Sequence, residues 1–598
     1  MTTIDHRFNS IDTKVSLLLR LWQHFGLNHK RQSFALLLLM IIASLAEVIS
    51  IGAVFPFLGV LIDPEKIYFI IRSNPFGNYI QLQKPSDLLL PLTIIFCAAS
   101  LLSGAIRLAL LWATMKFSFS VGADLSASMF RKTLYQPYSV HVSRNSSSII
   151  SGISIKVGSV IYHIITPLLT GISSAIILIF LVIALLSFEP FLIFNAFLGF
   201  SIIYICIVLI SKKYLKNNSV VIAYESKKLI QILQEGLGGI RDILIDGSQE
   251  VYCKEYVESD SAMRRAQGSN QFIGNSPRYA LEALGMILIA VLAYGLVQEP
   301  QGVESAIPVL GVLALGAQRL LPMFQQLYTS WSSIKGNEEN LRDALVLLDQ
   351  QLPTDRKLNS NKPLEYQSEI VFKKVSFSYD SSDNYTLKDI DINIKKGSKV
   401  GIIGATGSGK STLTDIMMGL LKPSSGNLLV DGVSINQLNC HQWQLNIAHV
   451  PQSIYLADAS IAQNIAFGVP EELIDCDRVR QAAERAKISD LVDSWSMGYQ
   501  SRIGERGVQL SGGQRQRIGI ARALYKKARV LILDEATSAL DAQTENSVMT
   551  EINDLDPNLT ILIVAHRLET LKGCSQIIEL SKGSILRVGT YSEIIFST

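Results

Sequence analysis

Six long apolar segments, all in the first half of the chain or just beyond it, constrain the fold more than any other feature. Each is about long enough to cross a hydrocarbon core of roughly 30 Å as an α-helix, and soluble helices of this length normally carry a polar face. Composition agrees, with 48% hydrophobic residues and a mean hydropathy of +0.29 over 598 residues. Burial inside a large soluble domain is the alternative, which their length and number disfavour. The predicted spans are residues 34–61, 88–114, 161–187, 191–211, 280–297 and 306–327.

Basic residues indicate which ends of the spans face the cytosol. His29-Lys30-Arg31 precedes the first span, Arg131-Lys132 lies between the second and third, and a lysine-rich run at 212–216 follows the fourth. Because cytoplasmic loops carry an excess of Lys and Arg, we expect both termini to be cytoplasmic. We expect no cleavable signal peptide, and residues 15–25 favour a short amphipathic helix on the membrane surface or a plain solvated helix.

The last third of the chain carries a phosphate-binding pattern. Residues 404–411 read GATGSGKS and fit the template G-x-x-x-x-G-K-[ST], in which glycines let backbone N–H groups converge on phosphate oxygens. The apolar run 399–403 before them predicts a buried strand that enters the loop. We expect Lys410 to reach the β- and γ-phosphates and Ser411 to hold Mg²⁺, while the following helix presents its positive end to the anion.

A second apolar run, at residues 530–533, predicts another strand that ends in Asp534 and Glu535. Metal-dependent nucleotide hydrolysis requires two such carboxylates. Asp534 would serve Mg²⁺ directly or through water, and Glu535 would orient or deprotonate the attacking water. A solvated turn is the alternative interpretation of an Asp-Glu pair, which the nearby phosphate loop disfavours.

Further segments make this region resemble the ATP-binding cassette (ABC) family. Leu510-Ser511-Gly512-Gly513-Gln514 resembles the family's signature sequence, which ordinary phosphate-loop enzymes lack. The resemblance implies that Tyr379 stacks on adenine, Gln452 senses Mg²⁺ and the membrane domain, Asp541 ends the D-loop 538–541, and His566 is the switch histidine at the γ-phosphate. The predicted catalytic residues are Glu535 and His566, the predicted Mg²⁺ residues are Ser411, Gln452 and Asp534, and the predicted nucleotide-binding residues are Tyr379, Gly404, Ala405, Thr406, Gly407, Ser408, Gly409, Lys410, Ser411, Thr412, Gln452, Ser511, Gly512, Gly513, Gln514, Asp534 and Asp541.

In that family the nucleotide lies between two cassettes, with the phosphate loop of one facing the signature of the other. We find a single copy of each segment and no internal repeat, so the resemblance implies a partner, expected to be a second copy of this chain. Six spans followed by one cassette resemble the exporter-type half-transporters. Residues 118–158 and 212–274 fit their cytosolic extensions, and Gly504-Glu505-Arg506-Gly507 resembles an exporter-specific loop, although Glu505 could be an ordinary surface acid.

We therefore predict a multi-domain protein with an all-α six-helix transmembrane domain followed by an α/β P-loop ATPase cassette. The expected boundaries are a cytosolic N-terminal segment at 1–32, the membrane domain at 33–335, a linker at 336–366 and the cassette at 367–598. Within the linker, residues 341–349 look helical and 350–362 look flexible. The net charge of +3 and the absence of a basic stripe argue against a nucleic-acid partner, and six scattered cysteines predict neither disulfides nor a metal site.

Ionisable residues inside the predicted spans are the evidence for a cargo. Glu47, Arg107, Glu282 and Arg319 lie in the first, second, fifth and sixth spans, where a charge costs a few kcal/mol and normally faces water, a cavity or another charge. One interpretation is pairing that only holds the helices together. The other is a substrate cavity whose two arginines, doubled in a dimer, bind an anionic headgroup such as a phosphate or pyrophosphate.

A second resemblance supports the cavity interpretation. Residues 46–58 resemble the first span of bacterial lipid-linked oligosaccharide flippases, and the apolar loop 65–82 resembles their external helix, which engages the polyprenyl tail; a loop packed against the bundle is the alternative. We predict a homodimer in a bacterial inner membrane that uses ATP and Mg²⁺ to export a glycolipid or lipid-linked saccharide amid membrane lipids. The alternatives are a multidrug, lipid or peptide exporter and, more distantly, an ATP-gated regulator or channel.

Overall fold

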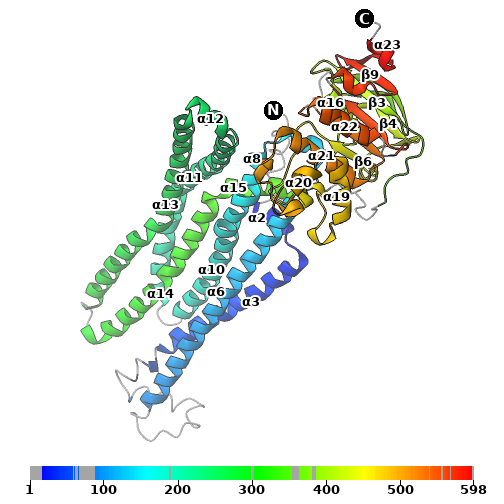
Figure 1. Cartoon of the computed structure of the whole chain (residues 1–598). Helices are drawn as coiled ribbons and strands as arrows, with labels where there is room; N and C mark the ends of the chain where they lie inside the picture. Colours follow the sequence, from blue (N-terminus) through cyan, green and yellow to red (C-terminus); the bar gives the residue numbers. More distant parts are fainter. Residues whose placement is uncertain are drawn as a thin grey trace. The chain divides into compact units, whose positions relative to one another are not determined.

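The computed structural model describes most of the chain, in two units (Figure 1). Contacts group residues 1–136 and 143–352 into a first unit, and residues 137–142 and 353–598 into a second. The predicted external helix at 65–82, apart from Glu65, and most of the predicted flexible joint lie outside the described residues. The described residues are 17–352 except 55, 58–59, 61–64, 66–87, 187–189 and 298–301, and 362–595 except 380–384, 538, 554–555 and 566.

The first unit consists of helices. Its long helices extend beyond the apolar segments into the polar stretches that follow the predicted spans. Two π-helical turns flank α9 just before α10, a type of irregularity that interrupts longer helices. Its elements are α2 (Leu17–Gln23), α3 (Leu27–Gly52), α6 (Leu89–Leu134), α8 (Ser146–Ser151), η3 (Gly152–Lys156), α9 (Val157–Val160), η4 (Ile161–Ile165), α10 (Thr166–Leu186), α11 (Pro190–Gly238), α12 (Ile240–Asp246), α13 (Gln249–Val297), α14 (Gly302–Gly336) and α15 (Glu338–Leu348).

The first unit exposes large apolar side chains on its outside and buries several polar ones together with its hydrophobic core. Ser44 of α3 and Ser103 and Ser118 of α6 are buried, whereas Phe34 and Leu101 are 70% and 76% exposed. Gly122 allows close helix packing, because a Cβ there would lie 2.1 Å from Ile161 Cδ1. An apolar outer surface with buried polar side chains is what a helix bundle surrounded by lipid requires.

Among the described residues, four helical stretches are long and apolar enough to cross a membrane: Leu27–Gly52, Leu89–Leu134, Ser146–Ala184 and Phe197–Gly238. They coincide with the first four predicted spans. The fifth and sixth predicted spans lie on α13 and α14, whose apolar ends are partly outside the residues with described side chains. The total of six spans therefore stays a prediction.

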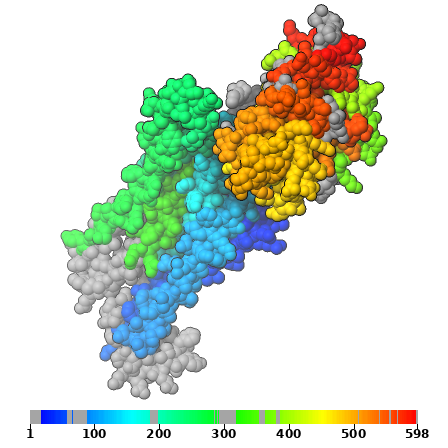
Figure 2. All heavy atoms as spheres, viewed as in Figure 1, coloured from blue at the N-terminus to red at the C-terminus, as the bar shows by residue number. Residues whose placement is uncertain are grey.

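Two features lie toward the polar ends of these helices. Helix α12 joins α11 to α13 at the tip of a protruding hairpin (Figures 1 and 2), where Leu237, Leu244 and Ile245 are exposed. Helix α15, within the predicted linker, buries its apolar face in the first unit together with Leu21 of α2.

The second unit combines a six-stranded sheet of order β10-β9-β3-β8-β7-β6 with a four-stranded sheet of order β2-β1-β4-β5. Residues 137–142, which include most of α7 (Tyr138–Ser143), also group with it. The strands are β1 (Glu369–Phe377), β2 (Leu387–Lys395), β3 (Lys399–Gly404), β4 (Ser425–Val430), β5 (Val433–Ser434), β6 (Ile447–Val450), β7 (Val530–Asp534), β8 (Thr560–Val564), β9 (Gln576–Ser581) and β10 (Ser584–Gly589).

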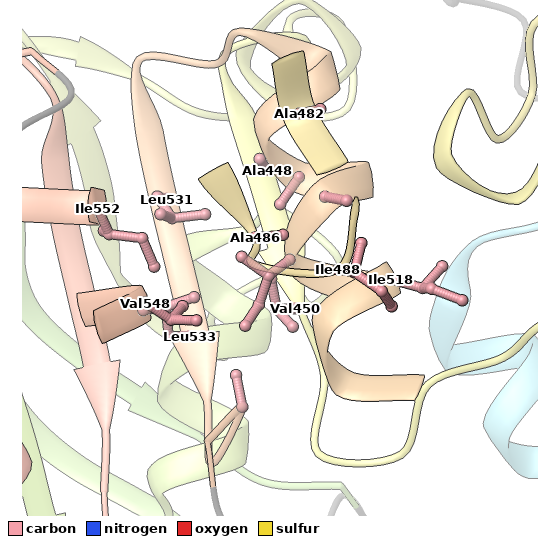
Figure 3. Packing of buried hydrophobic residues seen from close by; sticks show 14 of the residues in the cluster. Ala448, Val450, Ala482, Ala486, Ile488, Ile518, Leu531, Leu533, Val548 and Ile552 are labelled. Carbon is pink, nitrogen blue, oxygen red and sulfur yellow. The ribbon is translucent and has the colours of Figure 1, made fainter. Parts of the chain in front are cut away.

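Helices cover the six-stranded sheet of the second unit. Strands β6, β7, β8 and β3 are parallel neighbours and nearly wholly apolar, as strands buried on both faces must be. Figure 3 shows part of a hydrophobic core of this unit, where Val548 of α22 lies next to Leu533 of β7. The helices are α16 (Lys410–Met417), α17 (Cys440–Gln444), α18 (Ile461–Ile465), η5 (Glu471–Leu473), α19 (Cys476–Arg485), α20 (Ser489–Asp493), η6 (Gly498–Gln500), η7 (Glu505–Gly507), α21 (Gly512–Lys526), α22 (Ala542–Asn553), η8 (Leu568–Leu571) and α23 (Tyr591–Ile595).

Candidate nucleotide site and membrane charge cluster

The predicted nucleotide residues gather at one edge of the six-stranded sheet. Gly404 ends β3, Ala565 follows β8, Glu535 follows β7, and Gln452 stands two residues after β6. Since these four strands are parallel neighbours, their carboxyl ends meet at the same edge, where open α/β sheets bind ligands. His566 and Ser538 lie outside the described residues.

The phosphate loop connects β3 to α16 and needs its glycines. Gly404, Gly407 and Gly409 have φ of 150°, 82° and 102°, a region that other residues rarely adopt. A Cβ at Gly404 would lie 2.3 Å from the carbonyl oxygen of Leu580, and one at Gly409 would lie 2.6 Å from Leu387 Cδ2. The loop therefore wraps tightly at the start of α16, where the positive end of a helix attracts anions.

Lys410 and Ser408 have the properties of phosphate ligands. The buried Lys410 donates from Nζ to the carbonyl oxygens of Gly404, at 2.8 Å, and Ala405, at 3.2 Å, so its ammonium group lies against the loop. The hydroxyl of Ser408 is buried and has no hydrogen-bond partner among the described residues. A buried unpaired hydroxyl beside a lysine suits a phosphate oxygen, which accepts from both. Thr406 and Ala405 complete the loop and are exposed.

Tyr379 contacts the first turn of α16, next to the phosphate loop. Ser411 is exposed, whereas Thr412 is buried with its Oγ1 3.3 Å from the hydroxyl of Tyr379. The Tyr379 ring packs edge-on against Phe377, with centroids 4.9 Å apart, and is 57% exposed. Its open ring surface can stack on a planar base.

The two carboxylates after β7 have different surroundings. Glu535 has a φ of 49° and donates its backbone N–H to the carbonyl oxygen of Val564, while its Oε2 accepts a 2.6 Å hydrogen bond from Nε2 of Gln452. A strained backbone at such a position is common at functional sites. Asp534 lies close enough to Asp415 of α16 to affect its ionisation. Burial, and secondly the negative charge of Asp534, raise the pKa of Asp415 to about 6.

These residues suit a magnesium–nucleotide complex. Two repelling carboxylates, Asp534 and Asp415, favour a divalent cation, and the hydroxyl of Ser411 opens the adjoining helix. Oxygen ligands supplemented by phosphate oxygens are what Mg²⁺ prefers, so Ser411, Asp534 and Gln452 would hold the ion together with the nucleotide. A group of three or more His, Cys, Asp or Glu side chains suited to a metal is not found in the described part of the chain.

The signature residues form the start of α21. Ser511 caps this helix by accepting from the N–H of Gln514, and Gln514 Oε1 accepts in return from the N–H of Ser511, forming a capping box. A Cβ on Gly513 would lie 3.1 Å from the carbonyl oxygen of Ala539, so the glycine lets the D-loop pack on this turn, and one on Gly512 would lie 3.4 Å from Ala539 Cβ. Asp541 accepts from the N–H of Thr544, and that hydrogen bond holds its pKa below the usual value.

The signature and the phosphate loop remain separate within one chain. Strand β3 is three strands away from β6, on which α21 packs, and strand spacings of about 4.8 Å make that separation roughly 14 Å. Among the described residues, no hydrogen bond or ion pair joins residues 404–412 to residues 511–514. One chain thus presents two half sites.

A buried glutamate not predicted from the sequence connects two loops of the site. Glu545 of α22 accepts at Oε1 from the hydroxyls of Thr537, at 2.8 Å, and Thr570, at 2.9 Å, and its Oε2 lies 3.2 Å from Arg567. These partners come from the segments after β7 and β8. A single acid on a polar helix gave no sequence signal for this role, since its partners are distant in the chain.

In the first unit, three of the four predicted cavity residues meet. Glu47, 4% exposed, receives hydrogen bonds from Ser103 (3.0 Å) and Arg319 (2.8 Å), and Arg107 Nε lies 3.2 Å from its Oε2. Glu282 is not part of this cluster, because it pairs at 2.7 Å with Arg278 one helical turn earlier. The i,i+4 spacing of that pair is visible in the sequence, and Ser103 stands at the same spacing from Arg107.

Comparison with known proteins agrees with both units. The fold and site define a phosphate-loop nucleotide-binding domain on the same chain as a helical membrane domain. The family model for the ABC transporter transmembrane region matches residues 33–303, and the model for the ABC transporter cassette matches residues 387–538. The chain belongs to the ABC transporters, with one membrane region and one cassette matched.

Individual relatives carry different names. An ATP-dependent lipid A-core flippase of Albidiferax ferrireducens is 33% identical over 61% of this chain and 62% of its own length. The alpha-hemolysin translocation ATP-binding protein HlyB of Escherichia coli O157:H7 is 38% identical over 47% of this chain and 39% of its own. Both alignments span less than two thirds of the relative's length.

A solved structure extends the comparison to nearly the whole fold. A bacterial Atm1-family ABC exporter with ATP bound superimposes with a TM-score of 0.78, covering 95% of this chain and 96% of that one at 20% identity. The expected fold class, a helical membrane domain followed by an ATPase cassette, is confirmed.

Proposed function

We propose that this chain is half of an ATP-driven exporter and works as a homodimer in a bacterial inner membrane, with its cassette and both termini in the cytoplasm. Its cargo is a glycolipid or lipid-linked saccharide that moves from the inner to the outer leaflet. The proposal has a nucleotide part and a cargo part, which rest on different observations.

The separation of the two half sites supports the nucleotide part. ATP would lie between the phosphate loop of one subunit and Ser511 of the partner subunit, so that binding closes the cassettes. Lys410 and the loop amides hold the phosphates, and Glu535, oriented by Gln452, deprotonates or positions the attacking water, with His566 at the γ-phosphate. Mg²⁺ held by Ser411, Asp534 and Gln452 would offset the charge that develops on the phosphate oxygens.

Closure and reopening of the cassettes would alternate the access of a membrane cavity between the two leaflets. The exposed apolar tip at α12 supports a homodimer, because Leu237, Leu244 and Ile245 are 60–72% exposed in the single chain and suit the surface of a second copy.

The proposed cargo is supported by the net charge of the cluster formed by Glu47, Arg107 and Arg319 (the Glu47 cluster). One buried carboxylate faces two guanidinium groups, and neither Arg107 nor Arg319 pairs with another carboxylate among the described residues. The cluster thus keeps one net positive charge, and both arginine side chains are 42% exposed. A cation left over inside a membrane domain is costly unless an anion comes to it, and a phosphate or pyrophosphate fits the guanidinium geometry.

Transport with purified protein in liposomes tests the cargo. Arg107→Ala with Arg319→Ala should abolish transport of a phosphate-bearing lipid and spare a neutral hydrophobic drug. Because the double change leaves Glu47 buried without a cation, a triple variant that adds Glu47→Gln separates lost recognition from lost stability. Arg264→Ala, which removes an exposed arginine of α13, serves as the matched control. Equal loss for both cargoes would assign the arginines to structure.

Polypeptide export is the second candidate, supported by the relative named for alpha-hemolysin translocation. Export of a polypeptide would depend little on Arg107 and Arg319. The lipid that co-purifies with the Glu535→Gln protein in mild detergent distinguishes the candidates, since a polypeptide exporter would bring no phosphate-bearing glycolipid with it.

A further inference from the structure

A cavity of about 540 Å³ opens between α11, α13 and α14 in the first unit, apart from the Glu47 cluster. Its lining combines Tyr204 of α11, Arg278 and Glu282 of α13 and a polar row on α14 with the apolar side chains of Leu281, Leu321 and Pro322. Its size falls in the range of roughly 300–1,000 Å³ that small-molecule sites occupy. Figure 1 shows α13 and α14 side by side along this part of the unit.

The polar row follows one side of α14. Gln318, Gln325 and Thr329 stand seven and four residues apart, which is close to two turns and one turn of a helix, and Gln326 adjoins them. Gln325 is fixed structurally: it accepts from the hydroxyl of Tyr204 at 3.2 Å and donates to the carbonyl oxygen of Gly274 at 3.0 Å. It holds the three helices together at the cavity.

The other two amides are free to bind something else. Gln318 and Gln326 are both exposed, and no hydrogen bond joins their side chains to another described residue. Arg278 and Glu282 pair with each other at 2.7 Å, so the cavity carries no net charge, in contrast to the Glu47 cluster. Its chemistry is that of amide donors and acceptors set in a largely apolar lining.

The predicted spans put the cavity near their cytosolic ends, where a headgroup would enter from the cytosolic leaflet. Arg278 and Glu282 flank the start of the predicted fifth span, and Gln326 is next to the end of the predicted sixth. Gln326 is also two turns from Arg319, about 10 Å along α14, on nearly the same side of the helix. A ligand whose phosphate sits at Arg319 could therefore place a neighbouring group beside Gln326.

We infer that this cavity is a saccharide subsite, which binds the sugar portion of the cargo while the Glu47 cluster binds its phosphate. The inference rests on the proposed function and adds the part of the cargo that each region recognises. Glutamine amides both donate and accept, as sugar hydroxyls do, and Leu321 and Pro322 in the same lining offer an apolar surface to a sugar face. Because Arg278 and Glu282 neutralise each other, the cavity would not attract a second anion.

Selectivity between two matched lipids tests this inference. ATPase stimulation of the purified homodimer in liposomes is titrated with a polyprenyl pyrophosphate that carries a disaccharide and with the same lipid without sugar. The wild type should respond to the saccharide lipid at a concentration roughly tenfold lower, as expected for one or two net hydrogen bonds. Gln318→Leu with Gln326→Leu should reduce this ratio to about one, and each single change should remove part of it.

Gln271→Leu is the matched control, because Gln271 is an exposed glutamine of α13 that does not line the cavity; it should keep the wild-type ratio. A wild type that responds equally to both lipids, or a double variant that keeps the tenfold ratio, overturns the inference. A wild type that responds to neither lipid would instead refute a polyprenyl-linked saccharide as the cargo in the proposed function. Since both glutamines are exposed and unpaired, leucine leaves no buried partner unsatisfied and the variants should assemble.

Discussion

Gln452 donates a 2.6 Å hydrogen bond from Nε2 to Oε2 of Glu535, across the carboxyl ends of the neighbouring strands β6 and β7. This contact fixes the carboxylate that we assign as the base. Glu535→Gln should lower ATP turnover by about 10²–10⁴-fold, because general-base catalysis contributes that much, while ATP still closes the cassettes. Phosphate release measures the first effect and cysteine cross-linking of the two cassettes the second. Normal phosphate release by the variant would remove Glu535 from the role of base.

Gly404 and Gly407 make a matched pair for testing the phosphate loop. Both have positive φ, but a Cβ at Gly404 would meet the backbone oxygen of its ladder partner Leu580 at 2.3 Å, whereas one at Gly407 would meet nothing within 4 Å. Gly407→Ala should therefore cost only the backbone term of about 1 kcal/mol. Gly404→Ala should cost at least about 2 kcal/mol more, seen as a larger fall in the thermal midpoint of the full chain. Equal midpoints would contradict the steric argument.

Glu545 should affect turnover although it is outside the predicted set. Its carboxylate holds Thr537, Arg567 and Thr570, and Arg567 directly follows His566. Glu545→Gln loses the charge that pairs with Arg567, so we expect kcat for ATP to fall about tenfold with KM little changed. Glu551→Gln on the same helix removes an exposed pair with Lys487 and should change kcat less than twofold. A rise in KM alone would instead indicate a role in holding ATP.

The sequence predicted the local secondary structure around the candidate nucleotide site, because its parts adjoin one another in the chain. A strand, a glycine-rich loop and a helix follow one another directly between Lys399 and Met417, so their order can be read from the sequence. Likewise the strand predicted to end in Asp534 and Glu535 is β7, whose last residue is Asp534. The contact between Gln452 and Glu535 depends on the strand order, which pairs β6 with β7 although they are far apart in sequence.

The sequence could not predict which of the charged residues in the membrane domain contact one another. The sequence supplied Glu47, Arg107, Glu282 and Arg319 as one set, since each is a charge in an apolar helix. Only packing of α3, α6 and α14 shows that three of them meet, because that depends on the rotation of each helix about its axis. Ser103 and Glu545 were missed for the same reason: neither is unusual until its distant partners are in place.

Asp431 should give the cassette a pH-dependent stability. Although burial opposes its ionisation, hydrogen bonds from the backbone of residues 367–369 and the hydroxyl of Ser368 hold its pKa below the usual value. A depressed pKa contributes stability above the unfolded value of 3.8 and loses it as pH falls through the folded value. Asp431→Ala should therefore lower the thermal midpoint by an amount corresponding to about 1 kcal/mol, allowing for solvent screening, equally at pH 7 and pH 5, with the difference shrinking below pH 4. Asp391→Asn, an exposed acid of β2, should shift the midpoint at no pH. A difference between wild type and Asp431→Ala that grows on acidification would contradict the proposed ionised clamp on residues 367–369.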